Sequence, residues 1–442
     1  MKKMLCLFLA AVLLLSLAAC GSSPAGKPGS DETDPAKPGI ESPAAENETP
    51  APVYTLSDEV ILDNDVCIFK ITKVDPDDYF GFVLKCYFEN KTEATSLYFT
   101  VDYPSINGYM VESYFSETVA AGKRSNTEIS FSKTALADAG ITSVDEIEFT
   151  LTARDSDNWL GDPLVDEAVT IHPTGKSAEE IKVPEKPSSD GGITVVSDGT
   201  CDVSVLSTYK NTVWDDWCLV FYLENRTDTV LNYSWEDVSV NGYMIDSLWS
   251  ATVTPGKRMI TTYGISKSTL EKIGISTPDE VEFALSVTER GNWTKDPYIS
   301  SDFTIRPTGK SADEIVIPER PMRASEKVIV SDDTCSFVIL EYYVDEIWGG
   351  SLSCWLENKT DEKLSFSWEN VSVDGYMIDP YWMSNVAPGK RKMVSIAFSD
   401  TALRENGITE PTEIEFTLRV RKFDDWFSSD LINETQSYFP QS

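Results

Sequence analysis

The chain has 442 residues, 41% of them hydrophobic and 11% aromatic, so it holds enough apolar material for several cores. Its 72 acidic and 37 basic residues give a formal net charge of −35. This excess of acid argues against nucleic acid as a partner, because phosphate binding requires a basic surface. It also argues against electrostatic docking on anionic lipid. The 24 Gly and 23 Pro exclude a collagen-like chain.

The N-terminus combines two lysines with a short apolar run over residues 4–15. This run is short for a transmembrane helix and has the length of a signal-peptide core. It is followed by Leu-Ala-Ala-Cys-Gly at 17–21, which resembles a bacterial lipobox. We therefore expect residues 1–19 to be a signal peptide and Cys20 to carry a lipid on the outer face of the cell membrane. The alternative is an ordinary secretory site or an uncleaved anchor with a chance cysteine.

Residues 20–55 contain mainly Gly, Ser, Pro, Ala, Asp and Glu. Such a segment buries too little apolar surface to fold, so it is predicted to be a disordered tether.

An internal repeat occupies the rest of the chain. Three motifs recur in the same order, each time at nearly the same spacing. They are Glu-Asn-Lys/Arg-Thr at 89–92, 224–227 and 357–360; Asn/Asp-Gly-Tyr-Met at 107–110, 241–244 and 374–377; and Gly-Lys-Arg at 122–124, 256–258 and 389–391. The period of about 134 residues is that of an autonomous domain. The predicted domains are 56–185, 192–320 and 327–442. Pro-rich connectors between them indicate limited contact between the repeats.

Strand patterns dominate each repeat. Ile147, Phe149 and Leu151 alternate with polar residues, and the same alternation returns at 281–287 and 414–420. One short helix is predicted per repeat: in the second, residues 268–271 fit a capping box and Gly274 the position after the helix. Thr134 with Gly140, and Thr401 with Gly407, occupy these places in the other two repeats. We therefore predict an all-β chain of three tandem antiparallel β-sandwich domains.

The second repeat reads ENRTD at 224–228, VSVNGYMID at 238–246, PGKR at 255–258 and EVEFALSV at 280–287. This order resembles the immunoglobulin-like β-sandwich repeats of uncharacterised lipoproteins from Gram-positive, clostridia-type bacteria. The resemblance covers all three repeats and implies an immunoglobulin-like fold for each. It implies no activity and no catalytic residue.

Each repeat contains two cysteines. In the first repeat Cys67 and Cys86 are equidistant from the centre of Asp75–Asp78, so a hairpin turning there would bring them together. The predicted disulfides are Cys67–Cys86, Cys201–Cys218 and Cys335–Cys354. The alternative is six reduced, buried thiols. No metal is expected, since CxxC spacing is absent and two cysteines without histidine make a poor metal site.

No catalytic motif stands out, and we expect neither an enzyme nor a cofactor. His172 is the only histidine, and Arg306 takes its place in the second repeat, which argues against a histidine-based triad as a property of the repeats and excludes a two-histidine metal site within one chain. Thr-Gly-Lys-Ser at 174–177 and 308–311 lacks the earlier glycine of a P-loop.

The aromatic residues give the strongest functional signal. Three aligned tryptophans, at 159, 293 and 426, are expected in the core, and Phe115, Trp249 and Trp382 are expected to be buried or half-buried. The candidate ligand-binding residues lie beside carboxylates near the hairpin tip between the two cysteines of each repeat: Tyr79, Phe80, Trp214, Trp217 and Trp348.

Aromatic faces of this kind can stack on a sugar ring or anchor a protein partner, whereas the alternative is hydrophobic cover for an open end of the sandwich. The Gly-Lys-Arg turns are expected to be solvated tips, with docking of a carboxylate partner as the alternative. The expected function is non-catalytic binding or adhesion to an extracellular protein or glycan. The alternative is a passive envelope spacer without a specific ligand.

Overall fold

The computed structural model describes residues 52–79, 81–188, 192–292, 294–345, 349–425 and 429–440. Within these ranges the chain forms 28 strands, three short α-helices and one 3-10 helix. The predicted all-β class and the tandem β-sandwich architecture are confirmed. The immunoglobulin-like assignment stays a prediction. The predicted signal peptide, the lipidation site Cys20 and most of the tether lie outside the described residues.

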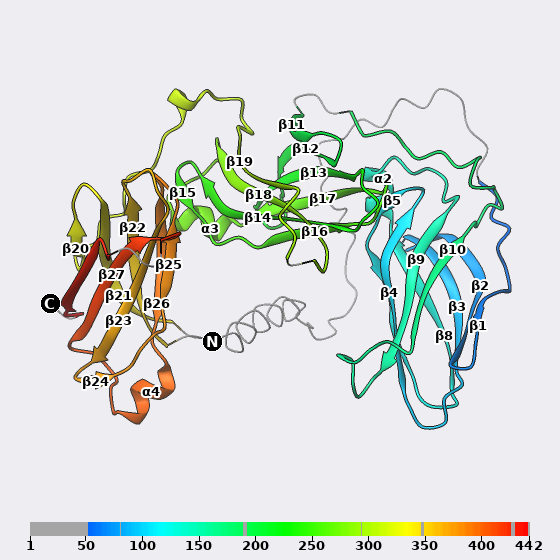
Figure 1. Cartoon of the computed structure of the whole chain (residues 1–442), viewed down its shortest axis with the longest axis horizontal. Helices are drawn as coiled ribbons and strands as arrows, with labels where there is room; N and C mark the ends of the chain where they lie inside the picture. The colour runs from blue at the N-terminus through cyan, green and yellow to red at the C-terminus, as the bar shows by residue number, and fades with distance from the viewer. Residues whose placement is uncertain are drawn as a thin grey trace. The chain divides into compact units, whose positions relative to one another are not determined.

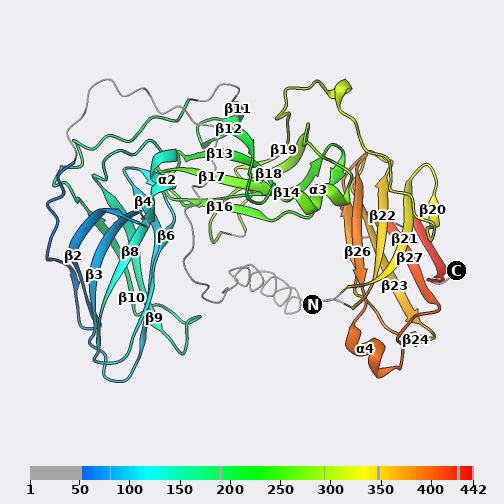
Figure 2. The same ribbon diagram turned by 180° about the vertical axis from the view of Figure 1, so that it is seen from behind.

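The first repeat consists of two facing sheets. One has the strand order β1-β2-β3-β8-β6 and the other contains β10, β9, β4 and β5, with β7 paired to β4. Figures 1 and 2 show these two layers from opposite sides. The elements are β1 Glu59–Asp63, β2 Cys67–Asp78, β3 Gly81–Asn90, β4 Leu97–Ile106, β5 Tyr109–Met110, β6 Ser113–Tyr114, β7 Ser116–Val119, β8 Arg124–Ser132, α2 Lys133–Asp138, β9 Ile147–Asp155 and β10 Val165–Ile171.

The second repeat follows the same plan. Its sheets contain β11, β12, β13 and β17 on one side and β14, β15, β18 and β19 on the other, with β16 paired to β14. The elements are β11 Ile193–Ser197, β12 Cys201–Lys210, β13 Trp217–Asn225, β14 Leu231–Val240, β15 Tyr243–Met244, β16 Trp249–Val253, β17 Arg258–Ile265, α3 Lys267–Lys272, β18 Val281–Glu289, β19 Ile299–Ile305 and η1 Ala312–Glu314.

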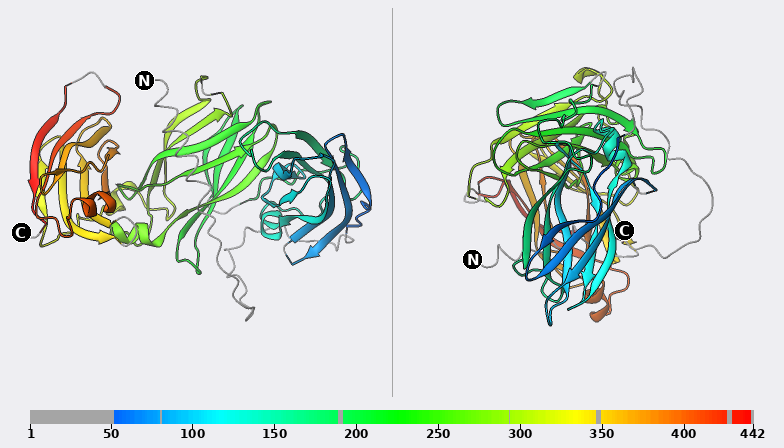
Figure 3. Two further views of the ribbon diagram at one scale, coloured as in Figure 1. Left: turned by 90° about the horizontal axis from the view of Figure 1, so that it is seen from below. Right: turned by 90° about the vertical axis from the view of Figure 1, so that its right-hand side faces the viewer.

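The third repeat repeats the plan once more. The strands β20, β21, β22 and β26 form one layer, and β24, β23, β27 and β28 form the other, with β25 paired to β23. The left view of Figure 3 shows these twisted layers, coloured yellow to red, from a further direction. The elements are β20 Lys327–Ser331, β21 Cys335–Asp345, β22 Gly349–Asn358, β23 Leu364–Val373, β24 Tyr376–Met377, β25 Met383–Val386, β26 Arg391–Ala397, α4 Asp400–Glu405, β27 Ile414–Lys422 and β28 Ile432–Tyr438.

The period-two alternation predicts the buried faces correctly. In β9, Ile147, Phe149 and Leu151 are buried between half-buried polar neighbours, and β18 and β27 bury the corresponding residues. Three hydrophobic clusters result, each drawn mainly from one repeat. Each sandwich therefore has a core of its own.

The short helices are present, but each begins earlier than predicted. In α3 the side chain of Ser266, not Ser268, accepts the hydrogen bond from the backbone of Thr269 that caps the helix. Ser132 and Ser399 cap α2 and α4 in the same way. Gly274 follows α3 with φ +71°, the left-handed conformation predicted for it.

The predicted disulfides are wrong, because the hairpin register separates the cysteines. Cys67 lies opposite Asn90, and Cys86 lies opposite Ile71. The hairpin therefore turns after Asp78 rather than within Asp75–Asp78, and four residues along the strand separate the two thiols by about 13 Å. Cys335 and Cys354 have the same offset, since they lie opposite Asn358 and Ile339.

In the second repeat Cys201 lies opposite Asn225, whereas Cys218 lies opposite Tyr209. Cys86 and Cys354 precede the motif asparagine by four residues, but Cys218 precedes Asn225 by seven. The three pairs are therefore not fully equivalent. All six cysteines of the repeats are buried thiols, which is the alternative left open by the sequence.

The repeats contact each other more closely than their polar connectors predict. The strand β5 of the first repeat pairs in parallel with the start of β17 in the second, and β15 pairs in the same way with β26 in the third. Two nine-stranded sheets therefore run across the boundaries between repeats.

Candidate functional site

The predicted aromatic residues that the structure describes lie on the hairpins β2–β3 and β12–β13. Tyr79 is 91% exposed at the first tip, and Trp214 is 73% exposed at the second. Trp217 is half-buried at the start of β13. Phe80 and Trp348 lie outside the described residues. Two of the three aromatic residues that the structure describes are thus mostly exposed to solvent.

The loop that carries Trp214 is held by side chains of its own. The Asn211 side-chain oxygen accepts hydrogen bonds from the backbone N–H groups of Val213 (2.8 Å) and Trp214 (3.2 Å). The backbone N–H of Asn211 donates to the carbonyl of Asp216 at 2.8 Å. These bonds close the loop over residues 211–216 and fix the backbone from which the exposed indole projects.

Helix α3 supports the same loop from the other side. The Asp216 carboxylate accepts a hydrogen bond of 2.9 Å from the backbone N–H of Lys267, the first residue of the helix. Trp217 donates its indole N–H to the carbonyl of Ser276, just beyond the helix, at 3.3 Å. Its ring packs against the core of the second repeat. The loop is therefore tied to the body of the sandwich at two points.

A cavity of about 370 Å³ lies between the loop and helix α3. Trp217 forms one apolar wall and Leu270 another. Ile275 and Gly274 also line it, and the polar part of the lining consists of Lys210, Asp215, Lys267, Glu271 and Ser276. This combination of an indole and several hydrogen-bonding groups is typical of sites for small polar ligands.

Charges of opposite sign alternate along this cavity. Asp215 forms ion pairs with Lys210 at 2.6 Å and with Lys267 at 3.0 Å. Hydrogen bonds from Lys210 and then Lys267 lower the pKa of Asp215, and the hydrogen bond that Lys267 donates to Asp215 raises the pKa of Lys267. Asp215 and Lys267 are therefore charged at neutral pH. They offer both donors and acceptors to the hydroxyl groups of a ligand.

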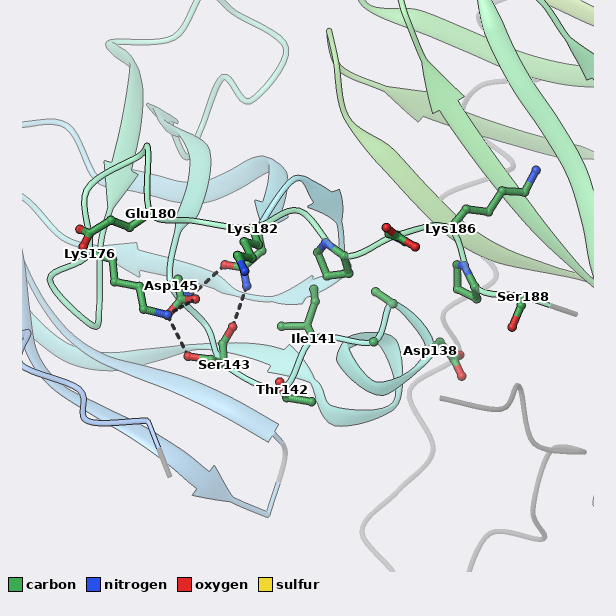
Figure 4. A pocket seen from close by; sticks show the side chains of 16 residues that line it. Asp138, Ile141, Thr142, Ser143, Asp145, Lys176, Glu180, Lys182, Lys186 and Ser188 are labelled. Carbon is green, nitrogen blue, oxygen red and sulfur yellow. Dashed lines mark hydrogen bonds and ion pairs between the residues drawn. The ribbon is translucent and has the colours of Figure 1, made fainter. Parts of the chain in front are cut away.

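A larger cavity of about 680 Å³ lies in the first repeat, between the end of α2 and residues 176–188 (Figure 4). Its polar wall is engaged internally. Lys176 forms an ion pair with Asp145 at 2.8 Å, and Thr174 and Ser143 donate to the same carboxylate at 3.0 and 2.8 Å. Burial raises the pKa of Asp145, but hydrogen bonds from Lys176, Ser143 and Thr174 outweigh it and lower that pKa overall.

The second repeat has the threonine and lysine bonds as well, since Thr308 and Lys310 both donate to Asp279 at 2.8 Å. The Thr-Gly-Lys-Ser motif therefore anchors the segment that follows the last strand. It has a structural role in both repeats, in agreement with the rejection of a P-loop.

The second and third Gly-Lys-Arg turns form ion pairs between repeats, whereas the sequence predicts solvated tips. Lys257 forms an ion pair with Glu148 of the preceding repeat, and Lys390 does so with Glu282. Arg258 contacts Glu224 at 3.1 Å and donates to the carbonyl of Pro184 at 2.6 Å. The alternative from the sequence was that these turns bind a carboxylate of a partner. The second and third turns bind a carboxylate of the preceding repeat within the same chain.

Of the other aromatic residues, some lie where the sequence predicts and one does not. Trp249 stacks on Trp235 with a centroid distance of 4.1 Å, and Phe115 and Trp382 are also partly buried, as predicted. The prediction for Trp159 is wrong, because this side chain is exposed in the loop between β9 and β10. Trp293 and Trp426 lie outside the described residues.

Among the described residues, no group of three or more His, Cys, Asp or Glu side chains is arranged to hold a metal ion. No helix in the same part of the chain has the length and hydropathy needed to cross a bilayer.

Neither a family model nor a curated protein matches the chain. Among solved structures, it is similar to a chain from a study of host cell surface retention of a 1.5-MDa bacterial ice-binding adhesin, with 12% identity, 81% of this chain and 90% of that chain covered, and a TM-score of 0.15. It is also similar to Lac15 from a marine microbial metagenome, with 12% identity over 78% of this chain and 88% of that chain. A third match is Escherichia coli alpha-2-macroglobulin, with 10% identity over 85% of this chain and 23% of that chain. The last two TM-scores are also 0.15, and scores of this size carry no argument about fold or function.

Proposed function

We propose that this chain is a non-catalytic binding protein, anchored by lipid on Cys20 to the outer face of a bacterial cell membrane, that recognises an extracellular glycan. The supporting observation is the cavity between the second hairpin tip and helix α3. There the half-buried ring of Trp217 stands beside Lys210, Asp215 and Lys267, and the loop next to it projects Trp214.

This combination suits a sugar because a pyranose ring has an apolar face and a rim of hydroxyl groups. The indole offers a flat apolar surface to the first, and the charged side chains offer donors and acceptors to the second. The loop is held by five hydrogen bonds, so little conformational freedom would be lost on binding.

An extracellular protein is the second candidate. Val213 and Trp214 are adjacent and both exposed, and a tryptophan at the centre of an interface often supplies much of the binding energy. A passive spacer is the third candidate. It is favoured by the pairing of strands across both boundaries, which restrains each repeat against the next.

The three candidates give different results in one experiment. The soluble chain from residue 21 onwards, called the processed chain below, lacks the signal peptide and the lipid-bearing Cys20. It is applied to a glycan array and, in parallel, used to capture extracellular proteins. For a glycan ligand, Trp214→Ala and Lys267→Ala should each weaken binding about tenfold or more. Tyr381→Ala, which removes an exposed aromatic ring of the third repeat, is the matched control and should leave binding unchanged.

If neither Trp214→Ala nor Lys267→Ala changes glycan binding, the cavity beside Trp217 is not the binding site. Capture of a protein that depends on Trp214 but not on Lys267 would favour the second candidate, and absence of any ligand would favour the spacer. The anchor is tested separately, by labelling cells with a radioactive fatty acid. The label should be incorporated by the natural chain and lost in Cys20→Ser.

A further inference from the structure

The two boundaries between repeats are built in the same way, and the first defines the pattern. Arg258 at the start of β17 pairs with Tyr109 of β5, and its backbone N–H donates to the carbonyl of Gly108 at 3.0 Å. Tyr109 is fully buried, and its hydroxyl donates to the carbonyl of Glu185 at 3.2 Å. Lys257 completes the contact through its ion pair with Glu148.

The second boundary reproduces each of these contacts. Arg391 pairs with Tyr243 and donates its backbone N–H to the carbonyl of Gly242 at 3.0 Å. Lys390 pairs with Glu282. The sulfur of Met244 accepts a hydrogen bond from the backbone N–H of Ala387 at 3.1 Å, as the sulfur of Met110 does from Thr254 at 3.2 Å in the first boundary. Both methionines are buried.

The third repeat presents the same edge with nothing on it among the described residues. Tyr376 and Met377 of β24 take the positions of Tyr109 and Met110, but they are 50% and 71% exposed. Glu415 takes the position of Glu148 and Glu282, opposite a serine of the neighbouring strand, and is exposed. The edge therefore has the residues of a boundary but no partner strand.

The conformation of this edge is already that of a boundary. Asp374 has φ +49°, as Asn107 and Asn241 have +46° and +42°. Its carboxylate accepts backbone hydrogen bonds of 2.9 Å from Thr412 and Glu413, and the amides of Asn107 and Asn241 accept the same bonds in their repeats. No rearrangement of the turn is needed for a strand to add to it.

The first repeat carries the complementary half. Gly122 has φ +64°, matching Gly256 and Gly389, and Lys123 and Arg124 behind it are exposed. Arg124 contacts Glu89 at 3.1 Å, as Arg258 contacts Glu224. Tyr87 is only half-buried, whereas Tyr222 and Trp355, its counterparts in the next two repeats, are buried.

We infer that the edge of β24 binds the Gly-Lys-Arg strand of the first repeat of a second copy of this chain. Arg124 would pair with Tyr376 in parallel, and Lys123 would form an ion pair with Glu415. The two surfaces differ from each other, so the contact is head-to-tail and each bound copy presents a new free edge. The predicted assembly is an open chain of copies, formed by the contact that already joins the repeats.

The intermolecular contact should be weaker than the internal ones. At the two boundaries Pro184 and Pro318 supply a carbonyl to the arginine, at 2.6 and 3.0 Å. The described part of the third repeat has no segment in that position. One hydrogen bond of each arginine is therefore missing between copies, and the second copy must also be brought from solution, which costs translational and rotational freedom.

Charge reversal provides a sharp test, because each end of the chain can be blocked separately. The processed chain is studied by sedimentation velocity over a range of protein concentration and should show a mass that rises with concentration. Lys123→Glu and Glu415→Lys should each weaken this self-association about tenfold or more. A mixture of the two variants should assemble again, because the two natural ends form the natural ion pair and the two changed ends form the same pair with reversed polarity.

The double variant Lys123→Glu/Glu415→Lys should assemble again, since it restores an ion pair with reversed polarity. Met377→Glu places a charge on the proposed contact and should block assembly, whereas Met322→Glu, at another exposed methionine, should not. A natural chain that stays monomeric at the highest soluble concentration would overturn the proposal. So would an assembly that neither charge reversal alters. Circular dichroism of each variant checks that the fold is retained.

Discussion

Lys257 of the second repeat and Glu148 of the first form an ion pair across the boundary between two sandwiches, and both side chains are half-buried there. The lysine belongs to a repeated turn and the glutamate to a repeated strand, so the pair joins two copies of one motif set. The same relationship between Lys390 and Glu282 shows that it belongs to the repeat itself.

The coupling between Lys257 and Glu148 should be measurable in a double-mutant cycle. We expect Lys257→Ala and Glu148→Ala to show an interaction energy of about 1 kcal/mol in the free energy of unfolding by urea. The coupling should decrease at high salt, because ions screen the pair. The more exposed pair of Lys73 and Asp75, at 3.5 Å, is the control and should show a coupling near zero. Equal couplings for the two pairs would contradict the importance of the boundary contact.

Tyr109 and Tyr376 occupy equivalent positions in the first and third repeats. Their substitution therefore compares the stability contributed by a tyrosine at a boundary with that contributed by a tyrosine at an unpaired edge. Tyr109→Ala should lower the free energy of unfolding by about 3–5 kcal/mol, because it removes a fully buried ring. Tyr376→Ala should cost about 1 kcal/mol or less in the monomer, because half of its ring already faces solvent. The measurement is urea denaturation at low protein concentration. If both variants lose a similar amount of unfolding free energy, the two tyrosines are buried to a similar extent, which contradicts this prediction.

Asp145 should make the first repeat sensitive to acid. Its pKa is lowered in the folded chain, so its contribution to stability is present above the ordinary aspartate pKa and is lost as the pH falls through the folded value. Asp145→Asn should flatten the decrease of the urea midpoint below about pH 4. Asp166→Asn, on the exposed face of β10, is the matched control and should leave that decrease unchanged. A natural chain whose stability is constant down to pH 2.5 would contradict this role.

The sequence was sufficient to predict the sandwich but not the boundary. Alternation of apolar and polar residues identifies a strand such as β9 because burial has the same period as the side chains. The disulfide prediction failed because register depends on where a hairpin turns, and bulges such as that between Ile71 and Lys73 shift it without a sequence signal.

The pairing of Lys257 with Glu148 was not predictable for a different reason. A repeat shows that a lysine and a glutamate recur, but not whether they meet within one copy or between two. The positions of two exposed candidate residues were predictable. Tyr79 and Trp214 lie at hairpin tips as predicted, because the residues that form a turn are neighbours in the sequence. The cavity beside Trp217 was not foreseen, since it depends on α3, which is 50 residues away in the chain.

The buried thiols should make the fold sensitive to alkali. Burial raises the pKa of Cys67 to about 11 and that of Cys86 to about 12, and it also raises the pKa of Cys201 and Cys335 to about 12. A cysteine thiol of the unfolded chain has a pKa of about 8.5. Because the folded values are raised, the stabilisation is fully present below that pH and is lost as the pH rises towards the folded values.

The free energy of unfolding of the processed chain, measured with urea, should therefore fall between about pH 8.5 and pH 10.5, at up to about 1.4 kcal/mol per thiol and pH unit. Cys86→Ala should show a shallower decrease than the natural chain, whereas Ser125→Ala, on the neighbouring strand β8, should not. In native buffer an alkylating reagent should modify the six thiols slowly, and in urea it should modify all six without any reductant. Thiols that react only after reduction would restore the disulfide interpretation, and rapid labelling of the native chain would show that the sandwich cores are open to solvent.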